Sequence, residues 1–366
     1  MSIINVAFWN LQNLFDAVPS EIAADLEFTP ENGWTEAAVA AKIDALVEGV
    51  ATMFYGRGPD LLGVCEIETA GLLARFTQAL NARLGRDDLT FAHAESPDLR
   101  GIDCSLIYSS DIFEPAGVPV GHIVFLRFRT RDIFEVSLRV RETGAGLVVF
   151  VSHWPSRSRG TLQSQPYRIT VASHLARRVD AWLKLPRARV VAAPLADLTT
   201  DMDAAWNRNV LVLGDLNDDP FDISVLSELT ATNSLDKLEE DLPAPGDDMG
   251  ARERYLRRTP ALYNMSWKPL GIPGEGTMFF SRDTVRTKQV FDQIITSRGL
   301  VYGRSGLRID PLDYTIHAPR LLWTNQALAD DAPRHMVRPK RFDPETGRGY
   351  SDHFPVTCQI VTVGMA

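Results

Sequence analysis

The chain has 366 residues, 45% of them hydrophobic, and a formal net charge of −9 at pH 7. This length and composition are typical of a globular protein with a large core, and the negative charge gives no whole-chain attraction for nucleic acid. Because no apolar run reaches the ~18 residues of a membrane span and no basic segment opens the N-terminus, we expect a cytoplasmic protein without a membrane span.

Strand and helix patterns alternate in the first half of the chain. Apolar residues recur at helical spacing after Thr35, a good N-cap residue, and predict a helix over residues 36–53. A second helix is expected over residues 71–84. Short apolar runs predict strands over residues 3–9, 61–65, 104–108, 123–128 and 133–140.

The second half contains apolar runs that end in polar residues. Strands are expected over residues 146–152, 210–213, 290–297 and 354–360. One amphipathic helix is expected over residues 168–183. Apolar surroundings predict buried free thiols, and hence a reducing compartment, for all cysteines of the chain: Cys65, Cys104 and Cys358.

Helices separate the early strands, whereas several later strands follow one another directly. This order predicts an α/β fold in which two mixed β-sheets pack face to face with helices outside. Polar strand ends come from both halves of the chain, which favours one cleft built by both halves. We therefore expect a single domain over residues 1–366, with long loop insertions near 186–209, 236–276 and 303–349.

Polar side chains at the predicted strand ends carry the chemistry. They are Asn10, Glu66, His153, Asp215, Asn217, Asp292, Asp352 and His353. Carboxylate and amide oxygens are hard ligands that suit Mg²⁺, Mn²⁺ or Ca²⁺. Two histidines among carboxylates supply acid–base groups. A hard metal and acid–base histidines together suit hydrolysis of a phosphate ester.

Six short motifs occur in a fixed order along the chain. They are Phe8-Trp9-Asn10-Leu11-Gln12-Asn13, Cys65-Glu66, Ser152-His153-Trp154-Pro155-Ser156, Gly214-Asp215-Leu216-Asn217, Phe291-Asp292-Gln293-Ile294-Ile295 and Ser351-Asp352-His353-Phe354-Pro355-Val356. In this order they resemble the motifs of the endonuclease/exonuclease/phosphatase superfamily, whose fold is similar to that of deoxyribonuclease I. The stretch Arg100-Gly101-Ile102-Asp103 is similar to that of bacterial members.

The resemblance implies a four-layer α/β sandwich with an active site where the edges of the two sheets meet. It implies that Glu66, supported by Asn10 and Asp352, holds a catalytic Mg²⁺, with Mn²⁺ or Ca²⁺ as alternatives. Gln12 stands where some relatives carry an aspartate ligand, which leaves a second metal position open.

The resemblance also implies roles for the remaining strand-end residues. Asp215 and Asn217 would position the attacking water and contact the phosphate. His353, oriented by Asp292, would be the base or the transition-state stabiliser. His153 would lie on the leaving-group or phosphate side. The sequence leaves open which group deprotonates the water.

Arginines next to the motifs are candidates for phosphate binding. Arg100 and Arg168 are predicted to bind substrate, because the resemblance places similar arginines there. A basic cluster before the last motif suits a substrate with more than one phosphate: Arg334, Arg338, Lys340, Arg341 and Arg348. Asp103 either orients His153 or pairs only with Arg100.

The first functional interpretation is a metal-dependent phosphodiesterase that acts on DNA or RNA and needs no obligate protein partner. The alternative is a phosphatase or phospholipase-type phosphodiesterase for small-molecule, inositol or lipid phosphates. A third possibility is a catalytically silent binding protein of the same fold. The sequence argues against it, because every motif keeps the residue expected to bind metal or to act in catalysis. Asp218 and Asp219 are expected to be turn residues.

Overall fold

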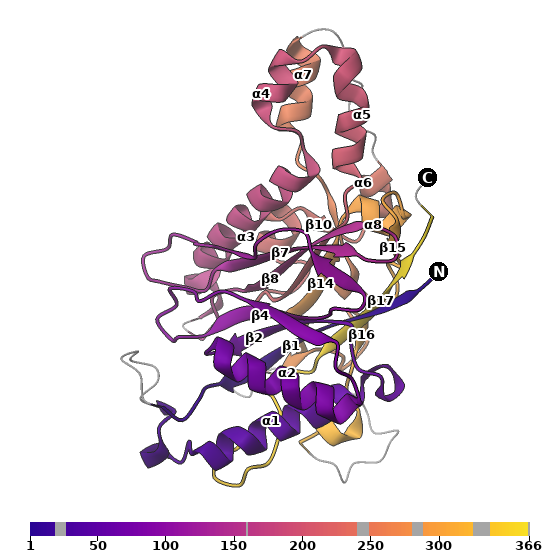
Figure 1. Cartoon of the computed structure of the whole chain (residues 1–366). Coiled ribbons are helices and arrows are strands. Elements are labelled where there is room, and N and C mark those ends of the chain that lie inside the picture. Colours follow the sequence, from indigo (N-terminus) through magenta and orange to yellow (C-terminus); the bar gives the residue numbers. More distant parts are fainter. Residues whose placement is uncertain (19–26, 159, 240–248, 280–287, 325–336, 365–366) are drawn as a thin grey trace.

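The computed structural model describes residues 1–18, 27–158, 160–239, 249–279, 288–324 and 337–364. Two β-sheets lie face to face between layers of helices (Figure 1). The strands of the first sheet are β1 (Ile3–Leu14), β2 (Leu61–Ile67), β3 (Leu89–His93), β4 (Asp103–Ser109), β15 (Leu307–Ile309), β16 (Thr315–Ile316) and β17 (Val356–Thr362). The strands of the second sheet are β5 (Phe113–Pro115), β6 (Val120–His122), β7 (Ile133–Val140), β8 (Gly146–His153), β9 (Val210–Asp215), β10 (Ala231–Thr232), β11 (Leu262–Asn264) and β14 (Asp292–Thr296).

Both sheets are mixed. The first has the order β15-β17-β1-β2-β4-β3, with β16 beside β17, and its parallel pair is β1 and β2. The second has the order β10-β11-β14-β9-β8-β7-β5, with β6 beside β7, and β8 runs parallel to β9. A separate short pair consists of β12 (Met278–Phe279) and β13 (Lys288–Gln289). The predicted four-layer α/β sandwich is therefore confirmed.

Helices α1, α2 and α3 lie on the outer sides of the sheets, and the structure contains eight described α-helices in all (Figure 1). They are α1 (Glu36–Ala51), α2 (Ala70–Leu84), α3 (Thr161–Leu183), α4 (Arg187–Ala192), α5 (Leu195–Trp206), α6 (Leu235–Glu239), α7 (Met249–Arg257) and α8 (Arg298–Tyr302). Short 3-10 turns are η2 (Pro30–Asn32), η3 (Met53–Gly56), η5 (Met265–Trp267) and η6 (Arg320–Leu322), and η4 (Ser224–Glu228) is a π-helical turn. Among the described helices, none is both long and apolar enough to cross a membrane.

Strand alternation builds the core on both sides of the first sheet. In β1, Val6 and Phe8 belong to the apolar cluster between the sheets, whereas Ala7 and Trp9 belong to the cluster under α1 and α2. Helix α1 begins where predicted, because the Thr35 side chain accepts a hydrogen bond from the backbone N–H of Ala38. The three cysteines are buried and free, as predicted.

The structure differs from the sequence prediction in the loops. Residues 123–128 form no strand, since Ile123 and Phe125 point into solvent. The segment 186–209, expected to be irregular, forms α4 and α5, which extend away from the sheets together with α7 (Figure 1). A small apolar cluster holds these helices, formed by Val190, Leu198, Met202 and Tyr255. The segments 236–276 and 303–349 also contain short helices and strands in their described parts.

Candidate active site

Strand pairing brings the acid–base residues of the second sheet together. His153 and Asp215 end the parallel strands β8 and β9 and are paired neighbours, and Asp292 begins the antiparallel β14 directly opposite Asp215. Close approach at this point requires a glycine, because a Cβ on Gly214 would lie 2.2 Å from the backbone oxygen of Ser152. The register alone therefore places three titratable side chains at one edge.

His353 reaches this group from the segment that leads into β17. Its Nδ1 lies 2.7 Å from Oδ2 of Asp292, and its Nε2 lies 3.7 Å from Oδ2 of Asp215. Ser351 fixes the segment, since its Oγ donates to the backbone oxygen of Asn10 at 2.6 Å and accepts from the His353 N–H at 3.1 Å. The Trp9 indole donates to the backbone oxygen of His353 at 2.9 Å. The imidazole is thus held by both sheets.

Carboxylates set the charge of His353. Burial alone would lower its pKa, but Asp292, Asp215 and Asp352 outweigh burial and raise this pKa well above its usual value. The hydrogen bond from Nδ1 to Asp292 adds to the effect. We therefore expect His353 to be protonated near neutral pH, with Nε2 directed toward Asp215.

The environment of His153 shifts its pKa in the opposite direction from that of His353. Burial, followed by the positive charges of Arg131, Arg100 and His353, lowers the pKa of His153 well below its usual value. Its Nε2 lies 3.5 Å from Oδ2 of Asp215 and 3.8 Å from Oε1 of Glu66. Its buried Nδ1 has no hydrogen-bond partner in the described part of the chain. One site therefore holds a protonated and a neutral histidine on either side of one carboxylate.

Asp215 lies at the centre of this group. Its Oδ2 accepts from Nδ2 of Asn10 at 3.0 Å, and its Oδ1 accepts from the backbone N–H of Asn217 at 3.0 Å. Burial raises the pKa of Asp215 to about 7; His353 opposes the shift and Asp292 reinforces it. Asn217 has φ of +50° and directs its amide to the backbone oxygen of Trp154 at 3.0 Å. Such a left-handed non-glycine residue is typical of a functional turn.

The candidate metal ligands lie on the first-sheet side. The bulge at the end of β2 gives Glu66 a φ of +63°, and its Oε2 accepts from the Asn13 N–H at 2.8 Å. Its Oε1 faces His153 and Arg100 at 3.8 and 3.9 Å and takes no hydrogen bond among the described contacts. Asp352, whose side chain is 30% exposed, lies 3.5 Å from Arg341. The Asn10 amide oxygen accepts from the backbone N–H of Gln12 at 2.8 Å. Carboxylate and amide oxygens are the donor types that suit a hard divalent ion, so these residues remain candidate ligands.

Gln12 and Lys42 complete the first-sheet side. Gln12 is buried, and its Oε1 accepts from the backbone N–H of Phe342 at 3.0 Å, so it anchors the segment before Asp352. Lys42 of α1 is fully buried, 3.4 Å from the backbone oxygen of Tyr350 and 4.8 Å above the Phe342 ring. Burial lowers its pKa to about 7, against the charges of Asp352 and Glu66.

A model of the endonuclease/exonuclease/phosphatase family matches residues 5–244. The chain belongs to this family. The matched segment contains Asn10, Glu66, His153, Asp215 and Asn217, whereas Asp292, Asp352 and His353 lie beyond it. The predicted resemblance is thereby confirmed. None of the curated proteins compared with the sequence matches it.

Three solved structures share the fold over nearly the whole chain. The structure of ANGEL2, a 2',3'-cyclic phosphatase, has a TM-score of 0.55 and 12% identity, covering 98% of this chain and 95% of its own. The mannosyl-6-phosphatase Bt3783 of Bacteroides thetaiotaomicron has a TM-score of 0.51 and 13% identity over 98% and 99%. D. rerio TDP2 with a single-strand DNA product has a TM-score of 0.50 and 14% identity over 99% and 100%.

The two arginines predicted to bind substrate differ in position. Arg100 is partly exposed beside Glu66 and donates to Oδ1 of Asn13 at 2.5 Å. Arg168 is fully buried in α3, with Nε 2.7 Å from Oδ1 of Asp218 and Nη1 donating to Ser164 at 2.7 Å. The structure therefore corrects the assignment of Arg168, which fastens the start of α3 instead of facing a substrate.

Three acidic residues also differ from the sequence prediction. Asp218 is buried, and pairs with Arg157 at 2.7 Å as well as with Arg168. The buried Asp219 accepts from the backbone N–H of Val290 at 2.8 Å, so neither residue is a solvated turn residue. Asp103 accepts from the backbone N–H of Ser96 at 2.8 Å and faces His93, not His153 or Arg100.

The sequence reading missed two buried cations that support the site. Lys42 interrupts the apolar face of the first predicted helix, a signal that was available in its spacing. Arg131 donates to the backbone oxygen of Trp154 at 2.8 Å and pairs with Asp98 at 3.3 Å. No sequence motif marks Arg131, because both partners are distant in the chain.

Within the basic cluster, Arg341 approaches Asp352 and Arg338 lies 3.9 Å above the Phe279 ring, while Arg334 lies outside the described residues.

Proposed function

We propose that the protein is a divalent-metal-dependent phosphodiesterase, with nucleic acid as its first candidate substrate. One observation carries the proposal: the Asp292–His353 pair, at 2.7 Å, and the neutral His153 both face the Asp215 carboxylate, and Oε1 of Glu66 lies 3.8 Å from the same Nε2 of His153. Acid–base groups and a hard-ligand carboxylate at one point are the requirements of phosphoester hydrolysis.

In this proposal, Glu66, Asn10 and Asp352 would hold the metal ion. The free Oε1 of Glu66 and the oxygen-only chemistry of the set fit Mg²⁺, with Mn²⁺ and Ca²⁺ as alternatives. When bound, the ion supplies Lewis acidity and neutralises charge on the substrate phosphate. The buried Lys42 adds positive charge behind Glu66 and Asp352.

The chain's own residues then bind the phosphate and move the proton. Asp215 lies beside both imidazoles, and its carboxylate takes a proton from the attacking water. The backbone N–H of Asn217 donates to this carboxylate and orients it. Protonated His353, fixed by Asp292, stabilises the added negative charge on the phosphoryl oxygens. His153 lies on the Glu66 side, where it contacts the phosphate or the leaving group.

The positions of two exposed cations favour a diester substrate that contains more than one phosphate. Arg100 lies 3.9 Å from Glu66 and Arg341 lies 3.5 Å from Asp352, so a cation stands beside each carboxylate of the metal set. A chain of phosphates could contact both, whereas a single phosphate needs one. The solved structures with this fold include both a phosphatase and a protein with bound DNA product. The shared fold therefore does not identify the substrate class, and the choice of a diester depends on the positions of Arg100 and Arg341.

A parallel substrate assay tests the proposal. Chelator-treated protein is supplied with Mg²⁺, Mn²⁺ or Ca²⁺ and incubated with plasmid DNA, RNA, bis-p-nitrophenyl phosphate and p-nitrophenyl phosphate. We expect metal-dependent cleavage of the diesters, with at least one nucleic acid cleaved, and loss of activity in His353→Ala. The matched control is His174→Ala, which removes a partly exposed imidazole on α3. Cleavage of the monoester alone would refute the nuclease assignment, and full activity in His353→Ala would refute the site.

A further inference from the structure

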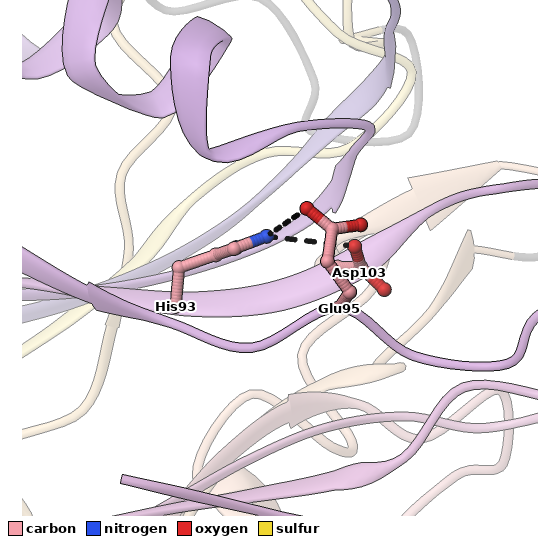
Figure 2. A group of neighbouring side chains, drawn as sticks. All are labelled: His93, Glu95 and Asp103. Carbon is pink, nitrogen blue, oxygen red and sulfur yellow. Dashed lines mark hydrogen bonds and ion pairs between the residues drawn. The ribbon is translucent and has the colours of Figure 1, made fainter.

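A second group of metal-ligating side chains lies at the edge of the first sheet, apart from the candidate active site. His93 ends β3, Asp103 begins β4, and Glu95 lies in the connection between them (Figure 2). Their neighbours Ala92 and Cys104 point into the core between the sheets. Because strand side chains alternate, His93 and Asp103 point to the opposite, helix-covered face. The first sheet therefore lies between this group and Asp215 of the second sheet, whereas Glu66 belongs to β2 of the first sheet itself.

The three side chains converge on one point. Nε2 of His93 lies 3.1 Å from Oε1 of Glu95 and 3.7 Å from Oδ2 of Asp103. One ligand atom from each residue lies within 4.8 Å of the other two. Figure 2 shows the imidazole directed at both carboxylates. Donor atoms around a transition-metal ion, each about 2.0–2.2 Å from it, have separations of this size.

Both buried ligands are already oriented by outer partners. Nδ1 of His93 lies 2.8 Å from Oγ of Ser105, which leaves Nε2 for the cluster. The backbone N–H of Ser96 donates to Oδ1 of Asp103 at 2.8 Å, which leaves Oδ2 for the cluster. Metal-binding histidines and carboxylates commonly have such outer hydrogen bonds.

The carboxylate of Asp103 is buried beside a second carboxylate. The Asp103 side chain is 3% exposed, and its Oδ2 faces Nε2 of the His93 imidazole at 3.7 Å. Its other neighbour is the Glu95 carboxylate, a second acceptor. A buried carboxylate beside a like charge requires a proton or a cation.

We propose that His93, Glu95 and Asp103 bind a Zn²⁺ ion at a second site, distinct from the candidate active site, with one coordination position left to solvent. One imidazole nitrogen and two carboxylate oxygens suit Zn²⁺ better than Mg²⁺, which prefers oxygen ligands alone. The bound ion links β3 to β4 across the connection that carries Asp98 and Arg100. Asp98 pairs with Arg131, which holds the backbone of Trp154 next to His153, so the ion stabilises the rim of the active site from behind.

Calorimetry on chelator-treated protein tests this site. Zn²⁺ is titrated into full-length protein in the presence of excess Mg²⁺, with metal content measured by mass spectrometry after dialysis. The background variant Glu66→Gln weakens the candidate catalytic site, so that binding at the second site is read alone. We expect one Zn²⁺ per chain in the wild type and in Glu66→Gln.

Variants of the cluster give the decisive comparison. Loss of an outer hydrogen-bond partner typically weakens metal binding about 10–100-fold, so we expect Ser105→Ala to weaken Zn²⁺ binding by about 10-fold and Asp103→Asn by at least 100-fold. Glu95→Gln keeps the result testable if Asp103→Asn fails to fold, because the Glu95 side chain is 68% exposed. His174→Ala is the control. Equal Zn²⁺ affinity in the wild type and Glu95→Gln, or loss of the Zn²⁺ in Glu66→Gln alone, would overturn the proposal.

Discussion

The two sheets contribute different chemistry to the candidate active site. The first sheet supplies Glu66 and Asp352, whose side chains are 12% and 30% exposed, together with Asn10. The second sheet supplies His153, Asp215 and Asp292, which are buried and in contact with one another. Oxygen donors that exchange a hydrated ion need access to solvent, whereas acid–base groups gain strength from a dry environment. In the proposed function, the candidate metal ligands and the candidate acid–base groups therefore come from different sheets, and His353 joins the two.

The largest effect is expected where the two sides meet. His353→Ala removes the imidazole that bridges Asp292 and Asp215, and we expect kcat to fall by about 10³–10⁴-fold, the upper part of the range for acid–base groups. Excess Mg²⁺ should not restore activity, because the metal ligands are intact. Turnover of the best substrate at several Mg²⁺ concentrations measures this. Restoration by Mg²⁺ would place His353 on the metal-binding side.

The sequence predicted the strand ends far better than the connections. Asp215 and His153 follow uninterrupted apolar runs, and the registers of β8, β9 and β14 bring them together without help from loops. Arg168 was misassigned, because its closeness to a motif in sequence gave no sign that Asp218 would neutralise it in the core. Helices α4 and α5 were missed because their apolar residues pack against α7, some fifty residues away. Tertiary pairing of this kind leaves no local pattern.

A metal-side variant should behave differently from His353→Ala. Glu66→Gln keeps the shape but removes the charge, and the loss of several kcal/mol of metal-derived stabilisation corresponds to about 10³-fold in kcat/KM. Unlike the histidine variant, it should show a higher Mg²⁺ concentration for half-maximal activity. Glu48→Gln, which changes an exposed glutamate on α1 paired with Arg83, is the control. Unchanged Mg²⁺ dependence in Glu66→Gln would remove this residue from the metal set.

A substitution at Asp292 tests whether its charge keeps His353 protonated. Asp292→Asn keeps the volume but removes the charge that raises the pKa of His353, so the imidazole loses its proton at a lower pH. We expect a fall of about 10²-fold in kcat, with the alkaline limb of the pH–rate profile moved to lower pH. Asp313→Asn, which alters a half-buried aspartate that accepts from the backbone of Gln359, is the control. A profile with an unmoved alkaline limb would show that Asp292 does not set the charge of His353.

Lys42 tests the first-sheet side with the smallest effect on turnover. Its side chain is buried against the backbone oxygen of Tyr350 and the Phe342 ring, so Lys42→Met should lower kcat less than tenfold and act mainly on the free energy of unfolding. The pKa of Lys42 is about 7 in the folded protein and about 10.4 in an unfolded chain. Between these values the unfolded chain binds more protons, so the lysine makes stability rise with pH, by at most about 1.4 kcal/mol per unit. Below pH 7 both states carry the proton, and this contribution is constant.

Urea unfolding between pH 6 and 10 therefore distinguishes a buried ammonium from an ordinary surface lysine. The wild type should gain stability relative to Lys42→Met below pH 10 as the pH rises above 7, whereas the exposed Lys237→Met control should follow the wild type throughout. Saturating Mg²⁺ sharpens the result, because an ion at Glu66 and Asp352 opposes the ammonium and should lower its pKa further, moving the rise to lower pH. If the free energies of unfolding of the wild type and Lys42→Met change with pH in parallel, the Lys42 ammonium is hydrated in the folded protein. The first-sheet side would then be open to water at Lys42 as well as at the candidate metal ligands.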